Sequence, residues 1–247
     1  MHLAILVTNT DHSPFAARHP RDGEKFTRLI QMARPDWQAT PLQIQAGEMP
    51  PDPSAFMAKF DGAIITGSPA STRSGLPWIA LLLSLIEKMD AAKFPLFGAC
   101  FGHQAIALAL GGVVDKNPNG WVHGLIPNQS KRALPWTKQL ADRFNLYGSH
   151  SEYVARLPAK AQESATSTGP DMGPNKSLTA GFHIGTHIWT SQHHPEMSHD
   201  FITALTDEMQ NDLGPTLYAQ AKNSLTQQAD QAAFAASLAQ FFNQSQL

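Results

Sequence analysis

Short apolar runs alternate with longer helical patterns along the first 110 residues, and this alternation limits the fold more than any other feature of the sequence. Strands are expected at residues 3–8, 42–45, 61–66 and 94–99, and helices at residues 23–33, 77–89 and 101–110. Strands separated by such helices are typical of a parallel sheet with crossover connections, whose functional groups gather at the carboxyl ends of the strands. Gly67 and Cys100 both lie at such ends.

The rest of the chain first becomes richer in strands and then turns helical. Further strands are expected at residues 121–126, 143–147, 162–167, 178–183 and 186–192. Residues 167–177 have the Gly, Pro, Asp, Asn and Ser content of a surface loop. After Ser198 the spacing is helical, with a last long helix over residues 225–242. We therefore expect one domain over residues 1–198 and a helical extension over residues 199–247, which either packs on that domain or serves an interface between copies of the chain.

Composition excludes several classes of protein. The chain has 247 residues with 42% apolar content, which suffices for a core and argues against disorder. A formal net charge of -2 provides no basic excess for nucleic acid, and one cysteine rules out an internal disulfide. Residues 1–7 lack the features of a signal peptide, and the most apolar window, residues 78–86, is too short to cross a bilayer. A soluble cytoplasmic protein without nucleic-acid or membrane partners is expected.

Cys100 stands in the sharpest local motif of the chain. It lies between Gly98 and Gly102, where a predicted strand ends and a predicted helix begins. This arrangement is the cysteine form of a nucleophile elbow, a tight turn that pushes the side chain outward and needs small neighbours. The start of the following helix favours a thiolate and offers free N–H groups to an oxyanion. The alternative is that Cys100 is simply a small buried apolar residue.

A cysteine nucleophile needs a histidine as its base, usually one distant in sequence. Eleven histidines are available, and the best candidate is His194, which is followed by Pro195 and Glu196. Here a predicted strand runs into a turn that proline makes rigid. Glu196 can accept a hydrogen bond from the ring of His194, which would select one tautomer and support the imidazolium form. A structural role for His194 is the alternative if this motif is taken without the elbow.

No motif for a metal or cofactor accompanies these residues. His183 and His187 are four apart, but Gly185 between them and their strand-like surroundings argue against a helical zinc pair. A phosphate-binding loop and a dinucleotide-binding glycine motif are both absent from the sequence. We expect no metal and no cofactor. Trp121 is expected in the core, with the mouth of the site as the alternative.

Three blocks of the sequence together resemble class I glutamine amidotransferase domains. They are residues 98–104 around the cysteine, residues 192–196 around the histidine and residues 65–71, which resemble the oxyanion loop of that family. The resemblance covers roughly residues 1–200 and is strongest to the stand-alone, GMP-synthase-like branch. It implies an α/β fold, a flavodoxin-like three-layer sandwich with a mostly parallel central sheet. The helical extension follows that domain.

The resemblance also implies a reaction and its residues. Cys100, His194 and Glu196 would form a Cys-His-Glu triad that attacks the γ-amide of glutamine, passes through a thioester and releases ammonia. The backbone N–H groups of Ser68 and Phe101 would form the oxyanion hole. The residues implied in substrate binding are Gly67, Gln104, Ser149, His150 and Ser151.

Three positions depart from the pattern of that family. Ser68 and Ser151 stand where glycine is usual, and His193 stands where the residue before the histidine is often aromatic. The two serines lie near the implied glutamine site, so they affect the choice of substrate more than the type of reaction.

Several functions therefore remain open. A glutaminase would need a separate synthetase subunit to use the ammonia, because the chain carries no ATP-binding synthetase domain. A protein that works alone would hydrolyse a γ-glutamyl amide or peptide with the same triad and a wider pocket. The chain could also be a non-catalytic regulatory relative, or a cysteine peptidase or stress protein on the same fold.

Overall fold

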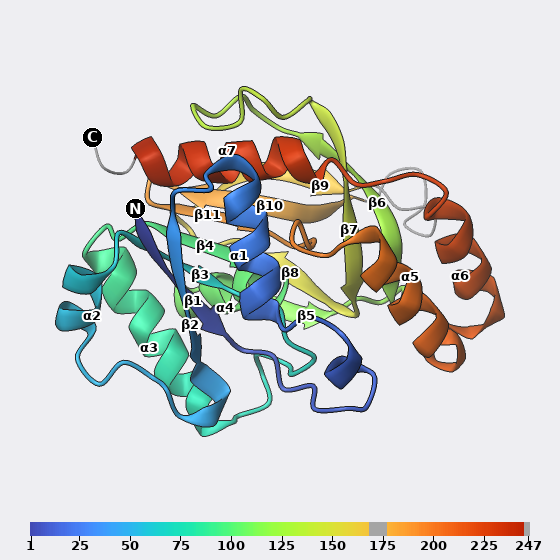
Figure 1. The fold of residues 1–247 in the computed structure, drawn as a ribbon, viewed down its shortest axis with the longest axis horizontal. Coiled ribbons are helices and arrows are strands. Elements are labelled where there is room, and N and C mark those ends of the chain that lie inside the picture. Colours follow the sequence, from blue (N-terminus) through green and yellow to red (C-terminus); the bar gives the residue numbers. More distant parts are fainter. Residues whose placement is uncertain (168–176, 245–247) are drawn as a thin grey trace.

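The computed structural model describes residues 1–167 and 177–244, and most of the loop predicted at residues 167–177 lies outside them. One half of the central sheet consists of five neighbouring parallel strands (Figure 1). In spatial order they are β2 (Gln38–Gln43), β1 (His2–Val7), β3 (Gly62–Ile65), β4 (Leu96–Ala99) and β11 (Ile188–Ser191). This half confirms the parallel sheet that the alternating pattern predicts.

Antiparallel pairing continues the same sheet beyond β11. The order there is β10 (Leu178–Ile184), β9 (Gln162–Ser167), β6 (Val122–Ser130) and β7 (Arg143–His150). Successive reversals leave β9 and β7 pointing with the parallel half, so seven of these nine strands share one direction. The sheet is therefore mostly parallel, as predicted.

Helices cover both faces of the sheet, because side chains of each central strand alternate between two cores. On β1, Leu3 and Ile5 join a core with α1 (Asp22–Ala33) and α7 (Gln231–Gln244), whereas Ala4 and Leu6 face α3 (Pro77–Ala91) and α4 (Phe101–Ala109). The result is the predicted three-layer sandwich, with α1 and α7 side by side in one layer (Figure 1).

The helical segment after residue 198 has two parts. α5 (His199–Glu208) and α6 (Gln210–Ser224) pack over β6 at the antiparallel end of the sheet, around Ile202 and Leu225. The last helix begins at Gln231, not near residue 225 as predicted, because Leu225 terminates α6 and a short link follows. The apolar residues of that link continue the helical spacing, so the sequence predicted one longer helix.

Several other elements differ from the predictions. β2 starts four residues earlier than expected, because it is an edge strand without a continuous apolar run. Helix α2 (Pro53–Lys59) and the two-stranded sheet of β5 (Val113–Lys116) and β8 (Glu152–Arg156) were not predicted. These strands are short and largely exposed, so their hydrophobic pattern is weak. No helix in the described ranges is long and apolar enough to span a membrane.

The side chain of Phe234 packs α7 against the sheet, and truncation of this side chain should destabilise the whole fold. Its ring is 1% exposed and stacks on that of Trp189, with centroids 4.8 Å apart. We expect Phe234→Ala to lower the free energy of unfolding by about 3–5 kcal/mol, measured by urea denaturation. The exposed Gln240 on the same helix provides the control, since Gln240→Ala should change the value by about 0.5 kcal/mol or less. Equal effects of the two variants would contradict a core role for Phe234.

Candidate active site

Cys100 occupies a strained turn between β4 and α4. Its backbone has φ 50° and ψ -103°, and positive φ in a residue other than glycine costs about 1–3 kcal/mol. Such strain is maintained only where the surroundings enforce it, and it is concentrated at functional sites. The side chain is buried, and it forms part of the wall of a cavity.

The two glycines that flank Cys100 leave no room for a side chain. A Cβ on Gly98 would lie 2.6 Å from the carbonyl carbon of Gly102. A Cβ on Gly102 would lie 2.4 Å from the carbonyl oxygen of Ile65, on the neighbouring strand β3. The first turn of α4 thus packs directly against strand backbone, as the G-x-C-x-G pattern predicts.

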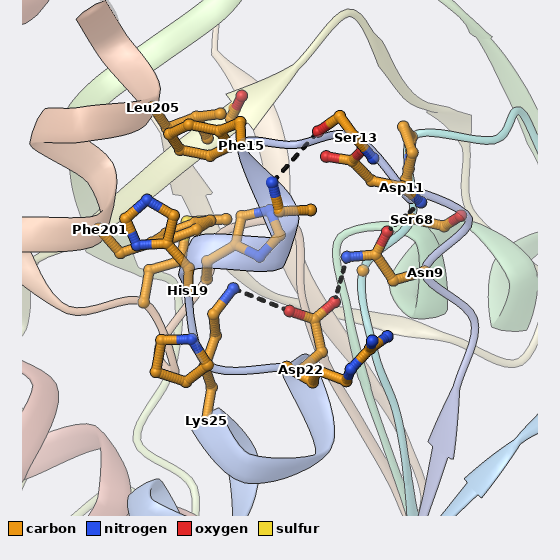
Figure 2. A pocket seen from close by; sticks show the side chains of 18 of the residues that line it. Asn9, Asp11, Ser13, Phe15, His19, Asp22, Lys25, Ser68, Phe201 and Leu205 are labelled. Carbon is orange, nitrogen blue, oxygen red and sulfur yellow. Dashed lines mark hydrogen bonds and ion pairs between the residues drawn. The ribbon is translucent and has the colours of Figure 1, made fainter. Parts of the chain in front are cut away.

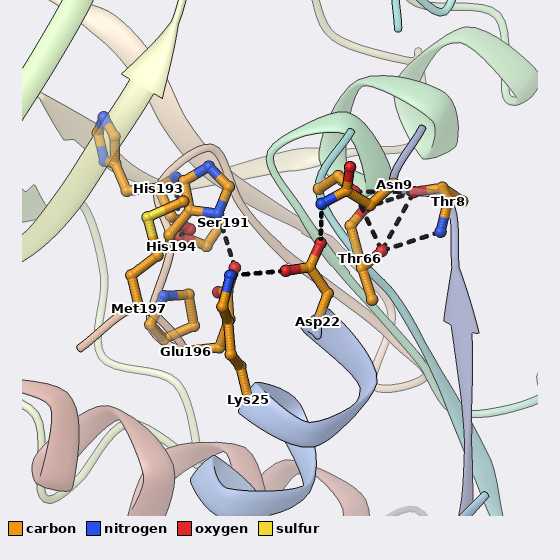
Figure 3. Close-up of polar contacts among 12 residues, drawn as sticks. Thr8, Asn9, Asp22, Lys25, Thr66, Ser191, His193, His194, Glu196 and Met197 are labelled. Atoms are coloured by element: carbon orange, nitrogen blue, oxygen red, sulfur yellow. Dashed lines mark hydrogen bonds and ion pairs between the residues drawn. The ribbon is translucent and has the colours of Figure 1, made fainter. Parts of the chain in front are cut away.

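His194 lies in the turn that follows β11 and faces both Cys100 and Glu196. Its Nδ1 lies 2.7 Å from Oε1 of Glu196 (Figure 3), and its ring is close enough to Cys100 for the two groups to interact electrostatically. Because Nδ1 is engaged with the carboxylate, Nε2 is the ring nitrogen left to exchange a proton with the sulfur. The backbone N–H of His194 donates to the carbonyl of Tyr147 at 2.8 Å, which fixes the turn against β7.

The electrostatics of this trio favour a charged imidazole. Burial by itself lowers the pKa of His194, but the negative charges of Glu196 and Cys100 outweigh it and hold that pKa well above its usual value. A protonated His194 beside the sulfur stabilises a thiolate, which is the nucleophilic form of cysteine.

Gln231, the first residue of α7, is hydrogen-bonded to the turn that carries His194 and Glu196. Its side-chain amide donates to the carbonyl of Pro195 at 2.7 Å and to that of Met197 at 3.2 Å, on either side of Glu196. The turn therefore has its backbone acceptors satisfied by a residue 36 positions beyond Pro195 in the chain. No sequence motif marked this contact.

The loop after β3 packs against the ring of His194. A Cβ on Gly67 would lie 2.7 Å from Cε1 of His194, so only glycine fits there. Thr8, at the end of β1, anchors the loop: its hydroxyl donates to the carbonyls of Thr66 at 3.0 Å and Gly67 at 3.1 Å (Figure 3). The ends of β1, β3, β4 and β11 thus converge on one site, as expected for a parallel sheet.

Ser68 and Phe101 each carry a backbone N–H that meets no acceptor among the described residues. Ser68 follows the tight Gly67 contact, and Phe101 is the first residue of α4. Ser68 has no positive φ, so serine takes the place of the family's usual glycine without backbone strain. Its hydroxyl accepts a hydrogen bond from the N–H of Ala70 at 3.1 Å.

A cavity of about 600 Å³ opens beside Cys100, a size typical of small-molecule sites. Of the predicted site residues, those on its wall are Gly67, Ser68, Cys100, Ser149, His194 and Glu196. Trp121 also lines it, so this side chain lies at the site and not in the core as expected.

Three residues implied in substrate binding do not line this cavity. Gln104 is buried, and its amide donates to the backbone carbonyl of Glu152 at 3.0 Å. The ring of His150 is hydrogen-bonded to the same carbonyl at 2.9 Å, and the carbonyl of Ser151 accepts from the N–H of Asn117 at 2.8 Å. Gln104, His150 and Ser151 therefore form a layer behind the cavity wall, where they hold β8 against α4.

Sequence reasoning missed the other half of the cavity. Its walls come from residues 9–21, from the start of α1 and from α5, including Phe15, Asp22, Lys25 and Phe201 (Figure 2). One signal was present, because residues 9–13 follow directly on the first predicted strand and are rich in polar groups. For the residues on α5 no pattern pointed to a site. Among the described residues, no cluster of three His, Cys, Asp or Glu could hold a metal ion.

Buried neutral histidines surround the trio. Burial lowers the pKa of His103 to about 3 and the pKa values of His123 and His150 to about 4. Each has a neutral partner: His103 meets the hydroxyl of Thr190 at 2.9 Å, and His123 meets that of Thr206 at the same distance. Among the buried histidines around Cys100, the positive charge is therefore confined to His194.

Comparison with known proteins supports one family. The model of the family described as glutamine amidotransferase class-I matches residues 37–203. The chain is 31% identical to a glutamine-hydrolysing GMP synthase subunit from Methanosarcina acetivorans, over 80% of this chain and 89% of that protein. It is 29% identical to γ-glutamyl peptidase 3 from Arabidopsis thaliana, over 62% of this chain, and it spans 61% of the length of that relative.

A solved structure has the same fold. The glutamine amidotransferase from Thermotoga maritima superposes with a TM-score of 0.69 at 17% identity, over 98% of this chain and 96% of that one. The likeness extends through α5, α6 and α7, because it covers nearly the whole chain.

The buried histidines should make stability depend on pH. Between pH 6.5 and about 4, the unfolded chain binds protons at His103, His123 and His150 that the folded chain does not bind. The free energy of unfolding should therefore fall as the pH drops through this window, by about 1.4 kcal/mol per pH unit for each histidine. His194 has the opposite sign: its contribution is complete below pH 6.5 and is lost as the pH rises through its raised pKa.

Urea denaturation at pH 7, 6, 5 and 4.5 measures this dependence. A free energy of unfolding that stays constant from pH 6.5 to 4.5 would show that these histidines are not buried in the neutral form. His103→Gln is a matched variant, because it removes one titrating group and should reduce the slope by about 1.4 kcal/mol per pH unit.

Proposed function

The chain belongs to the class-I glutamine amidotransferase family, and on that premise we propose that it is an amidase for the γ-amide of glutamine or of a γ-glutamyl compound. One observation carries the proposal: Cys100, His194 and Glu196 form a chain of interacting groups on the wall of a cavity, in which Nδ1 of His194 is hydrogen-bonded to Glu196 and Cys100 helps to raise the pKa of the ring. That chain has the order nucleophile, base and orienting carboxylate.

In the proposed reaction the thiolate of Cys100 attacks the amide carbon, and the electron pair of the carbonyl moves onto its oxygen. The backbone N–H groups of Ser68 and Phe101 donate to this oxyanion. The C–N bond then breaks, and the leaving nitrogen takes the proton of His194 and departs as ammonia or an amine. A thioester remains on Cys100.

Water completes the cycle. It transfers a proton to His194 and attacks the thioester carbon, and the C–S bond breaks. The γ-carboxylate product leaves, and the thiolate and imidazolium are restored. Glu196 accepts the hydrogen bond of Nδ1 throughout, so His194 keeps one tautomer and its position. Gly67, Ser149 and the buried Gln104, His150 and Ser151 are proposed to shape the position of the glutamyl group.

Two forms of this activity differ in the fate of the nitrogen. If the substrate is glutamine, the ammonia would serve a separate synthetase subunit, as the name of the GMP synthase relative indicates for that protein. If the protein acts alone, it would hydrolyse a γ-glutamyl peptide or amide. The wide cavity beside Cys100 and the relative named γ-glutamyl peptidase favour the second form.

We also propose the division into a domain over residues 1–198 and a packed helical extension over residues 199–247. The contacts of Phe234 with Trp189 and of Gln231 with the turn at Glu196 support the packing. A non-catalytic relative would not need to retain the strain at Cys100 or the pair His194 and Glu196, so an enzyme is favoured.

Replacement of the nucleophile tests the proposal. Cys100→Ala should abolish the release of ammonia from glutamine and of amine from γ-glutamyl amides, because no thioester can form. Release is followed with a coupled ammonia assay and by chromatography. Gln240→Ala is the control and should retain wild-type rates. Undiminished hydrolysis by Cys100→Ala would contradict the assignment.

The pH dependence of the rate tests the role of Glu196. Its carboxylate helps to raise the pKa of His194, so Glu196→Gln should lower that pKa. The alkaline limb of the profile of kcat/KM, where the imidazolium loses its proton, should therefore move to lower pH in the variant. An alkaline limb at the wild-type position would show that Glu196 does not act on the charge of His194.

A further inference from the structure

A buried ion pair lines the half of the cavity that the proposed reaction does not use. Asp22 and Lys25 lie one turn apart on α1, with Nζ of Lys25 2.9 Å from Oδ1 of Asp22 and both side chains 9% exposed. The side-chain amide of Asn9 donates to Oδ2 of Asp22 at 2.7 Å (Figure 2). Both carboxylate oxygens are thus engaged.

Lys25 keeps N–H donors to spare. Its ammonium lies 3.5 Å from the centroid of the Phe201 ring, so it is held between that face and the carboxylate. An ammonium has three N–H donors, and one hydrogen bond to Asp22 accounts for one of them. Burial of an ion pair contributes little net stability, so stability does not explain why a charge stands on this wall.

The walls around Lys25 are aromatic. Phe15, His19 and Phe201 form a cluster in which the rings of Phe15 and His19 lie 4.5 Å apart and those of His19 and Phe201 lie 5.2 Å apart. Leu205 stands beside them at the cavity (Figure 2). This half of the cavity therefore combines one buried cation with apolar side walls.

The other charged groups on the cavity do not cancel that cation. Arg21, His12 and Glu208 are exposed to solvent. Asp11 accepts a hydrogen bond from the N–H of Ser13 at 2.8 Å, and Glu196 is paired with His194. In this half of the described wall, Lys25 is thus the buried cation with donors available for an anion.

We propose that this half of the cavity is a subsite for the leaving amine, and that it selects γ-glutamyl amino acids, whose free carboxylate binds Lys25 and whose apolar side chain packs on Phe15, His19 and Phe201. The inference rests on the proposed function of Cys100. Glutamine itself releases only ammonia and makes no use of the subsite. The amino acid released by cleavage of a γ-glutamyl amino acid has the carboxylate and the apolar group that this half matches.

Two matched substrates test the subsite. γ-Glutamyl-phenylalanine and its carboxamide, γ-glutamyl-phenylalanine amide, have the same size and differ in the free carboxylate. The wild-type protein should hydrolyse the carboxylate form with a kcat/KM at least about tenfold higher, as expected for a hydrogen bond to a charged group. Release of phenylalanine or its amide is followed by chromatography.

Lys25→Met should bring the two kcat/KM values to within about twofold of each other. Because both substrates are measured on one preparation, a misfolded fraction cancels from the ratio. The double variant Asp22→Asn/Lys25→Met removes the pair without leaving a buried unpaired charge, and should lose the preference as well. Arg28→Met, an exposed position one turn further on α1, is the matched control and should keep the tenfold preference.

The outcomes separate the two proposals. Equal hydrolysis of both substrates by the wild-type protein, or a preference that survives in Lys25→Met, would overturn the subsite and leave the role of Cys100 standing. Failure to hydrolyse glutamine and both γ-glutamyl compounds would overturn the proposed function and the subsite with it.

Discussion

The close contact between the first turn of α4 and the backbone of β3 governs the rest of the structure. The carbonyl oxygen of Ile65 lies only 2.4 Å from where a Cβ of residue 102 would stand, so the helix can reach this position only with glycine there. The strained backbone of Cys100 lies two residues before this contact, at the start of the same helix. Strands β1, β3, β4 and β11 end around this point, and each contributes one part of the site.

The parallel half of the fold and the proposed trio were predictable from the sequence because their signals are local. A buried parallel strand such as β3 is a continuous apolar run, and the elbow at Cys100 is a glycine pattern over five residues. β2 and β8 lie at edges with mixed side chains, so their limits could not be predicted from hydrophobic spacing. The start of α7 depends on tertiary contacts, which the spacing of apolar residues does not record.

One wall of the cavity was likewise predictable from the sequence and the other was not. The wall next to Cys100 follows from motifs, whereas the opposite wall joins residues 9–25 to α5, segments about 180 positions apart that share no pattern. Only packing brings Lys25 to Phe201. The neutral histidines around His194 were also invisible in the sequence, because their charge state depends on burial and not on spacing.

The contact of Gln231 with the turn at Glu196 has a consequence for the order of events on the ribosome. A nascent chain that ends before residue 231 already contains Cys100, His194 and Glu196, but the carbonyls of Pro195 and Met197 still lack their partner. The core layer that α7 completes is also open at that stage. The turn that carries His194 and Glu196 therefore completes its hydrogen bonds only after α7 has been translated.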